Sequence, residues 1–220
     1  PVEETMETLN DLVAAGKVRY VGVSNFLGWQ LERAAQVAER SGWVPIVSLQ
    51  PQYNLLGREI ELELIPLCLD RGIGVLPWSP LGGGWLTGKY RRGVTPEGAT
   101  RLGEDPTRGL EKYEVRDSKR TWRVLDTVRR IADERGSTMG RVALNWLRRR
   151  PAVSSVLLGC RTTAQLEDNL AALDWDLDDS EMRELDDVSE PGDVDAVARP
   201  AADHLATTGP DQAFLLGDRH

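Results

Sequence analysis

The sequence has few cysteines and no long apolar run, so several classes of protein do not fit it. Its two cysteines, Cys68 and Cys160, lie far apart and outside any CxxC or Cys/His spacing, which argues against a disulfide framework and a metal site. No stretch of about eighteen apolar residues occurs, and residues 1–4 lack the basic flank and apolar segment of a signal peptide. We therefore expect a cytoplasmic protein with no membrane association.

The chain also has fewer positively than negatively charged residues. The chain has 27 Lys and Arg residues against 35 Asp and Glu, which gives a formal net charge of -8. Because an acidic surface repels phosphate backbones, we expect no nucleic acid partner. The 220 residues are 40% hydrophobic and 28% charged, a composition typical of a globular protein with one sizeable core.

The chain does contain short β-branched runs that alternate with longer segments of helical period, as in a parallel sheet with crossover helices. Strands are predicted at residues 18–23, 46–50, 73–77 and 153–158. Helices are predicted at residues 3–15, 27–40, 58–71, 118–135, 137–149, 163–173 and 179–188. Pro66 should bend the third helix.

The repeated units predict an α/β fold, either a doubly wound sheet or a barrel, because periodicity does not distinguish the two. A closed (β/α)8 barrel needs about twice the strands that the sequence offers. The connection at residues 81–115 is rich in Gly, Thr and Arg and is too long for a simple turn, which indicates a functional excursion. Residues 191–220 are predicted to form a loop-like tail.

Polar and aromatic side chains stand at the predicted carboxyl ends of the strands, where sites form in both architectures. These ends lie at residues 23–25, 49–54, 77–81 and 158–161. Their Ser, Asn and Gln side chains match the donors and acceptors of a carboxamide, and a Trp offers a flat face, as a nicotinamide requires. At any single strand end, the polar residues are explained more simply as caps of the helix that follows. Capping is a less satisfactory explanation for the polar residues at all four ends together.

Two segments are candidates for binding phosphate. Residues 81–90 form a glycine-rich turn followed by Lys89, and exposed amides beside an ammonium suit a pyrophosphate. Residues 159–163 begin a predicted helix, where the helix dipole and Arg161 favour an anion. Each signal alone is weak, because glycine turns and solvated arginines are common.

These segments together resemble the aldo-keto reductases, in particular the group that contains the potassium-channel β subunits and related bacterial reductases. The resembling motifs are GKVRYVGVSN at residues 16–25, QPQYN at 50–54, PWSPL at 77–81, LTGKY at 86–90, and residues 159–169. The resemblance extends from residue 1 to about residue 188. It implies a TIM-type (β/α)8 barrel family, of which residues 1–190 would be a C-terminal part with about four βα units, the last four strands.

The resemblance also implies a cofactor, NADP(H), and residues that bind it. Ser24, Asn25 and Gln50 would hold the nicotinamide carboxamide, with Trp78 stacked on the ring. The pyrophosphate region would be contacted by Ser79, Pro80, Leu81, Gly83 and Lys89. The adenosine and its 2'-phosphate would be surrounded by Arg101, Gly159, Arg161, Gln165, Asp168 and Asn169. Asp168 stands where the family usually has Glu.

The family's catalytic Asp, Tyr, Lys and His lie on its early strands, and no residue of this chain matches them. The tyrosines fall in other motifs, and His204 and His220 lie in the tail, so we assign no catalytic residue. The sequence therefore predicts an N-terminally truncated NADP-dependent reductase of aldehydes and ketones, inactive by itself. The alternatives are a non-catalytic NADP-binding regulatory subunit, similar to the channel β subunits, and an inactive fragment.

Two expectations about partners follow. The substrate would be a small carbonyl compound, for which Tyr53 and Trp85 would form either an aromatic wall or part of the core. An incomplete barrel leaves open strand edges, which favour association. We therefore expect either a homodimer or a complementing N-terminal half.

Overall fold

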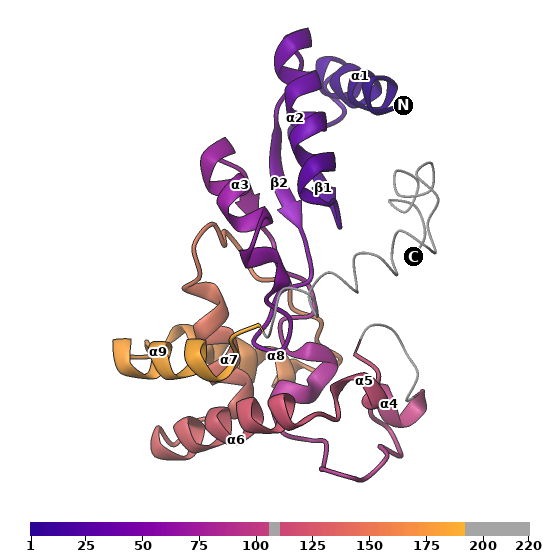
Figure 1. The fold of residues 1–220 in the computed structure, drawn as a ribbon. Coiled ribbons are helices and arrows are strands. Elements are labelled where there is room, and N and C mark those ends of the chain that lie inside the picture. Colours follow the sequence, from indigo (N-terminus) through magenta and orange to yellow (C-terminus); the bar gives the residue numbers. More distant parts are fainter. Residues whose placement is uncertain (106–110, 192–220) are drawn as a thin grey trace. The chain divides into compact units, whose positions relative to one another are not determined.

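The computed structural model describes residues 1–105 and 111–191, and these form two compact units. Unit 1 comprises Pro1–Pro51 and Glu59–Leu76, and unit 2 comprises Gln52–Arg58 and Pro77–Glu190. Figure 1 shows the helices and strands of both along the chain.

Unit 1 is built around a parallel sheet of three strands in the order β1-β2-β3. The strands are β1 (Val21–Ser24), β2 (Ile46–Gln50) and β3 (Gly74–Val75). Leu49 pairs with Val23 on one side and Val75 on the other, and both Leu49 and Val75 are fully buried. The predicted α/β class and the first three strands are thus confirmed, although β1 and β3 are shorter than expected.

The prediction of a fourth strand at residues 153–158 is wrong. No strand follows β3 in the described part of the chain. The amide of Leu157 donates to the carbonyl of Pro77 at 3.0 Å, but a strand requires a repeated ladder of such bonds. The four-stranded partial barrel is therefore not confirmed.

The helices of unit 1 are α1 (Val2–Ala14), α2 (Gly28–Ser41), the short 3-10 helix η1 (Glu59–Glu61) and α3 (Leu64–Arg71). The single helix predicted at residues 58–71 is thus two helices. Pro66 lies in the first turn of α3, where its missing amide costs no helical hydrogen bond. Pro66 therefore belongs to the start of a helix and does not bend one.

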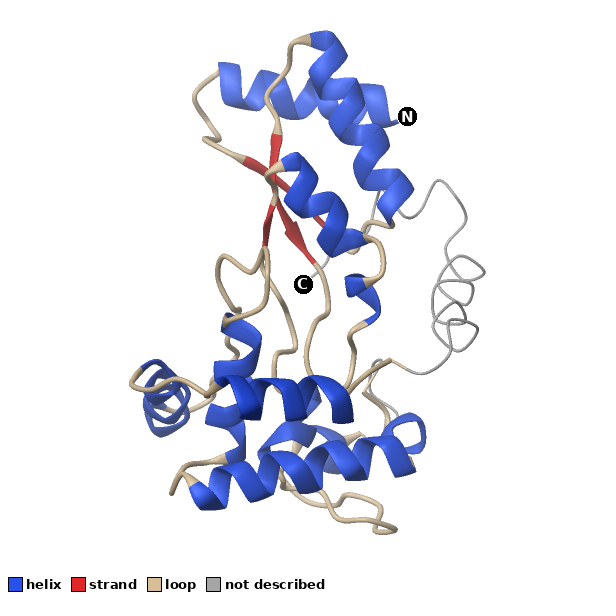
Figure 2. Ribbon diagram, turned by 60° about the vertical axis from the view of Figure 1, so that its left-hand side comes forward, coloured by secondary structure: helices blue, strands red, loops and turns tan. Residues whose placement is uncertain are grey.

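Helix α2 packs on α1 and on the sheet, as Figure 2 shows in the helices that surround the red strands. Its face toward the core carries Leu31, Ala34 and Ala38, all of which are buried. The helix ends at Gly42, which adopts φ 65°, a left-handed conformation that glycine reaches without strain. The apolar spacing and the glycine stop together explain why the predicted bounds agree closely with the observed ones.

Unit 2 is mainly helical. Its elements are η2 (Gly82–Thr87), α4 (Arg101–Glu104), α5 (Tyr113–Arg116), α6 (Lys119–Glu134), α7 (Met139–Arg148), α8 (Thr163–Leu170), η3 (Ala171–Leu173) and α9 (Asp179–Val188). Helix α6 packs against α7 and α9. Within residues 1–105 and 111–191, no helix combines the length and the apolar character needed to cross a bilayer.

Trp85 is the centre of an aromatic cluster in unit 2. Its ring lies 5.0 Å from Tyr90, 5.3 Å from Tyr113 and 5.6 Å from Trp122, measured between centroids. The indole is fully buried, and its Nε1 donates to the carbonyl of Glu111 at 3.1 Å. Trp85 is therefore part of the core, and Tyr53, which is 1% exposed, is buried as well.

A charged network fixes α9 to the rest of unit 2. The Asp186 carboxylate accepts hydrogen bonds from Trp146 Nε1 at 2.9 Å and from Arg150 Nη1 at 2.8 Å. Arg58 Nη2 lies 3.7 Å from the same carboxylate, and the Arg58 side chain is only 7% exposed. Both guanidinium groups also lie over the Trp146 ring, at 5.4 Å for Arg58 and 4.9 Å for Arg150.

Replacing the carboxylate of this network should destabilise the protein. We expect Asp186→Ala to lower the free energy of unfolding by roughly 3 kcal/mol, because it leaves buried cationic and N–H donors without their acceptor. Asp187→Ala is the matched control, since Asp187 is the next residue and is exposed. Urea unfolding followed by circular dichroism measures both, and equal losses in the two variants would contradict the role assigned to Asp186.

Candidate cofactor site

A cavity of about 940 Å³ lies in unit 2. Most of the residues that the sequence analysis assigned to cofactor binding line it. These are Trp78, Ser79, Pro80, Leu81, Gly83, Lys89, Arg101, Gly159, Arg161, Gln165, Asp168 and Asn169. The structure thus brings together segments that are up to ninety residues apart in sequence, from residue 78 to residue 169.

The turn at Ser79 is held by a buried amide. Ser79 has φ 55°, a conformation that few residues other than glycine adopt. The Asn54 side chain, which is fully buried, donates from Nδ2 to the Ser79 carbonyl at 2.9 Å. Its Oδ1 accepts from the amide of Leu56 at 2.8 Å. Asn54 lies in the QPQYN motif, for which the sequence suggested no role at this position. The structure shows that its side chain positions the turn at Ser79.

The glycine loop differs from the exposed cradle that the sequence suggested. The amides of Gly82 and Gly84 donate to the carbonyls of Ser79 and Leu81, each at 2.9 Å. The amide of Gly83 donates to the Ser79 hydroxyl at 3.2 Å. Because all three amides are occupied within the loop, the side chains of the cavity supply its attraction for an anion.

Three cationic side chains line the cavity together: Lys89, Arg101 and Arg161. Burial lowers the pKa of Lys89 below its ordinary value, and the positive charges of Arg161 and Arg101 lower it further. A carboxylate of the cavity lies near this cluster, because Glu104 Oε1 is 3.7 Å from Arg161 Nη1. The remaining positive charge makes the cavity suitable for a ligand with several negative charges.

The close approach of Lys89 to the glycine loop requires a residue without a side chain at position 84. A Cβ atom on Gly84 would lie 2.3 Å from Lys89 Cε and 2.4 Å from Nζ. Gly84 also has φ 96°. Gly84 is therefore needed both for the path of the backbone and for the position of the ammonium group.

The start of α8 is capped by side chains. The Thr162 hydroxyl accepts from the amide of Gln165 at 3.2 Å. The Gln165 side chain accepts from the amide of Arg161 at 2.8 Å. Gln165 thereby fixes the backbone from which the Arg161 guanidinium extends.

Asp168 and Asn169 have partners within the protein. Asp168 Oδ1 lies 2.7 Å from Arg141 Nη2, and Oδ2 accepts from the Thr138 hydroxyl at 3.2 Å. Asn169 Nδ2 lies 3.2 Å from Cys160 Sγ. The Asp168 carboxylate therefore ties α8 to the start of α7, in addition to its position on the cavity wall.

The other three predicted residues belong to unit 1, where they lie together at the ends of β1 and β2. The Ser24 hydroxyl donates to the Gln50 carbonyl at 2.8 Å, and the amide of Asn25 donates to the same carbonyl at 3.2 Å. Asn25 has φ 56°. Two strand ends thus carry a residue in a strained left-handed conformation, Asn25 after β1 and Ser79 after β3, as is common at functional sites.

Sequence reasoning missed several residues of the cavity wall. They are Gly84, Thr87, Glu104, Leu157, Leu158 and Ala164. Gly84 and Thr87 lie inside the segments that were quoted as motifs, so proximity in sequence gave a signal for them. Leu158 and Ala164 likewise lie inside the segments at residues 158–161 and 159–169, whereas nothing in the sequence distinguishes Leu157 from an ordinary core residue.

The size and the lining of the cavity suit a large anionic ligand. Small-molecule sites enclose roughly 300–1,000 Å³, and the cavity of about 940 Å³ is at the upper end of that range. Its wall combines three cationic side chains with the indole of Trp78. Such a wall suits a large ligand that carries both phosphates and aromatic rings.

The like-charge cluster can be tested through the pKa of Lys89. We expect this pKa to lie below the ordinary value of a lysine, mainly because of burial, and Arg161→Ala to raise it, because removing a neighbouring positive charge favours the ammonium form. The shift of the lysine Cε resonance with pH measures it, and the chain has only four lysines. Arg123→Ala, an exposed position on α6, should leave the pKa unchanged; an equal effect of both variants would contradict the cluster.

Comparison with known proteins identifies the family. The family model described as the aldo/keto reductase family matches residues 1–190. An aldo-keto reductase of Fusarium vanettenii is 38% identical over 191 residues, which cover 87% of this chain and 50% of the relative. The versiconal hemiacetal acetate reductase of Aspergillus parasiticus is 32% identical over 85% of this chain and 53% of its own.

Similarity extends to proteins named for a different role. A probable voltage-gated potassium channel subunit beta of Arabidopsis thaliana is 34% identical over 79% of this chain and 52% of its own length. The chain spans about half the length of the curated relatives it matches. Because the family model covers nearly all of the described residues, the chain belongs to the aldo/keto reductase family.

Proposed function

We propose that this chain binds NADP(H) and forms the cofactor-binding part of an NADP-dependent aldo-keto reductase, which reduces an aldehyde or ketone to an alcohol. The observation that carries the proposal is the group of Lys89, Arg101 and Arg161 around one cavity that also contains Trp78. Members of the family generally use a nicotinamide cofactor, and when bound, that cofactor supplies the hydride.

Each part of the proposed site has a role that follows from its chemistry. Trp78 provides a flat face for the nicotinamide ring, and the Lys89 ammonium neutralises the pyrophosphate. Arg101 and Arg161 supply guanidinium groups for the phosphate on the adenosine ribose, since their fork of N–H donors matches a phosphate. NADP is therefore favoured over NAD, because only NADP has that additional phosphate.

The proton that completes carbonyl reduction requires a donor, and we assign none within these 220 residues. We propose that the donor and the rest of the substrate site come from residues outside this sequence, in the same chain or in a partner. General acid catalysis contributes roughly 10²- to 10⁴-fold to a rate. The 220 residues alone are therefore proposed to bind the cofactor but to reduce carbonyl compounds poorly.

Titration with NADPH, followed by tryptophan fluorescence, tests cofactor binding. We expect saturable binding that is weakened roughly tenfold or more by Arg161→Ala, because the variant loses a charged contact to phosphate. NADH should bind more weakly than NADPH to the wild type and should be nearly insensitive to the substitution. Arg123→Ala serves as the control, since it removes the same charge from an exposed site outside the cavity.

Two results would contradict the proposal. Equal affinity for NADPH and NADH would remove the preference for the additional phosphate. No binding of either would mean that these residues form no cofactor site by themselves, as expected of an inactive fragment.

The similarity to a potassium channel subunit beta supports a second candidate, a regulatory NADP-binding subunit. Turnover separates the two functions. If the sequence is joined to an N-terminal half from a full-length relative, such as the Fusarium vanettenii protein, a reductase should oxidise NADPH with an aromatic aldehyde. NADPH binding without turnover in that chimera would favour the regulatory role; the parent relative, assayed in parallel, shows that the aldehyde is a usable substrate.

A further inference from the structure

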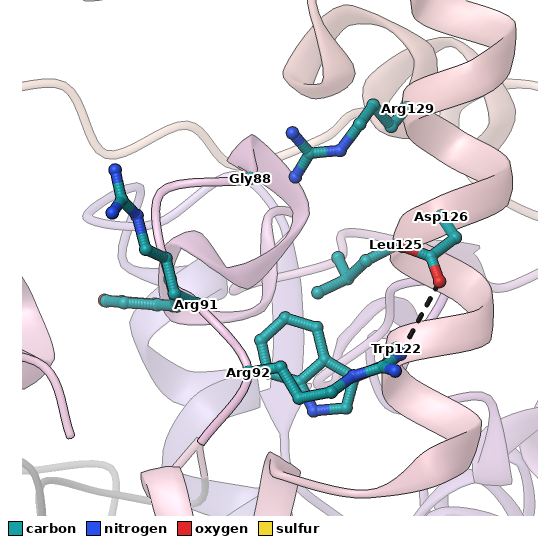
Figure 3. A pocket seen from close by; sticks show the side chains of 8 residues that line it. Gly88, Arg91, Arg92, Trp122, Leu125, Asp126 and Arg129 are labelled. Atoms are coloured by element: carbon teal, nitrogen blue, oxygen red, sulfur yellow. Dashed lines mark ion pairs between the residues drawn. The ribbon is translucent and has the colours of Figure 1, made fainter. Parts of the chain in front are cut away.

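Unit 2 has a second depression, of about 420 Å³, between the segment that follows η2 and the middle of α6. It is lined by Gly88, Tyr90, Arg91, Arg92, Trp122, Leu125, Asp126 and Arg129. Figure 3 shows the Arg129 side chain reaching from α6 toward the turn at Gly88, with the Arg91 guanidinium beyond that turn. Three arginines and one carboxylate thus surround one small space.

Positive charge in this depression is largely unneutralised. Arg92 pairs with Asp126, with 3.6 Å between Nη2 and Oδ2, and both side chains are mostly exposed. Arg91 and Arg129 have no carboxylate partner in the ion pairs of residues 1–105 and 111–191. The next arginine of α6 behaves differently, because Arg130 pairs with carboxylates of α6 and α9. In a chain with a net charge of -8, two arginines without such a partner on one depression give it a local positive charge.

The backbone beside the two arginines is held by the core. The Tyr113 hydroxyl donates to the carbonyl of Arg91 at 2.8 Å, and Tyr113 is itself buried. Gly88 has φ 73°, and a Cβ atom there would lie 2.4 Å from Met139 Sδ and 3.4 Å from Arg129 Nη2. The turn therefore needs glycine at position 88, whereas the side chains of Arg91 and Arg129 extend from this backbone as exposed groups.

The floor of the depression is aromatic and apolar. Trp122 and Leu125 are buried among the residues of α6, and the Arg92 guanidinium lies over the Trp122 ring at 5.5 Å. Trp122 Nε1 donates to Asp117 at 2.6 Å, so the orientation of the indole is set. This arrangement leaves Arg92 stacked and paired, while Arg91 and Arg129 are available for a ligand.

The depression is separate from the cofactor cavity, although the same segment contributes to both. Thr87 and Lys89 line the cofactor cavity, whereas Gly88 and Tyr90 line the depression. Neighbouring residues thus belong to different cavities. Arg91 and Arg129 take no part in the cofactor cavity.

We propose that this depression is a second anion site, which binds a phosphate group with the Arg91 and Arg129 side chains that line it. Planar guanidinium groups match the oxygens of a phosphate, and two of them offset its double charge. The group would be either free phosphate or the head of a phosphorylated small molecule. The proposal does not depend on the identity of the cofactor.

Fluorine NMR of the 220-residue chain labelled with 5-fluorotryptophan tests the site, because the chain has seven tryptophans and one of them lines each cavity. Trp122 reports on the depression and Trp78 on the cofactor cavity; Trp122→Phe and Trp78→Phe assign their resonances. Titration with inorganic phosphate should shift the Trp122 resonance to saturation. The double variant R91A/R129A should need at least roughly tenfold more phosphate for the same shift.

Two control variants make the result specific. Arg123→Ala removes an exposed charge from the same helix, and Arg161→Ala disrupts the cofactor cavity. Both should leave the Trp122 titration within about twofold of the wild type, as expected for changes outside the site. Phenyl phosphate distinguishes free phosphate from a phosphorylated organic ligand. If phenyl phosphate binds more tightly than inorganic phosphate, the ligand is a phosphorylated organic molecule; if the two bind equally, it is free phosphate.

The proposal is overturned if the Trp122 resonance does not respond to phosphate, or if its response survives in R91A/R129A. Loss of the response in Arg161→Ala would also overturn it, because the signal would then come from the cofactor cavity. Circular dichroism of each variant confirms that it is folded before the titration is interpreted.

Discussion

Burial of the Trp85 indole is the constraint on which both cavities of unit 2 depend. The ring is enclosed by Tyr90, Tyr113 and Trp122, and its Nε1 donates to the carbonyl of Glu111. A buried tryptophan makes many contacts and needs a partner for its N–H, so it tolerates little movement. The residues on both sides of Trp85 are therefore held as well, and they include the glycine loop and the residues of both cavity walls from position 82 to position 92.

This rigidity allows like charges to be kept close together. Lys89, Arg101 and Arg161 repel one another, which is why the pKa of Lys89 is lowered, after the effect of burial. Gly84 admits the Lys89 side chain closely, and Gln165 fixes the backbone of Arg161. An anion bound among these side chains would relieve the repulsion between them.

Membership of the aldo/keto reductase family gives this chemistry a context. The residues that approach the cofactor in the proposal come from the segment after β3 and from the start of a helix. Ser79 has a positive φ value, and the buried Asn54 holds the Ser79 turn. Strained residues supported by buried polar groups are typical of sites that need accurate positions.

The sequence by itself determined the longer helices α1, α2, α6, α7 and α9, the first three strands and the family, because these depend on local periodicity, on glycine stops such as Gly42 and on motifs that are continuous in sequence. The division of residues 58–71 into η1 and α3, and the short helices α4 and α5, came from the structure alone. It also identified most residues of the cavity wall through the family motifs. Only the tertiary structure decided that residues 153–158 form no strand, since pairing depends on a distant neighbour. It also showed that the glycine amides are occupied within their loop, and that Asp168 binds Arg141. Hydrogen bonds and ion pairs between distant segments leave no periodic signal in the sequence. The second depression also could not be predicted from the sequence, because it forms where residues 88–92 meet the middle of α6.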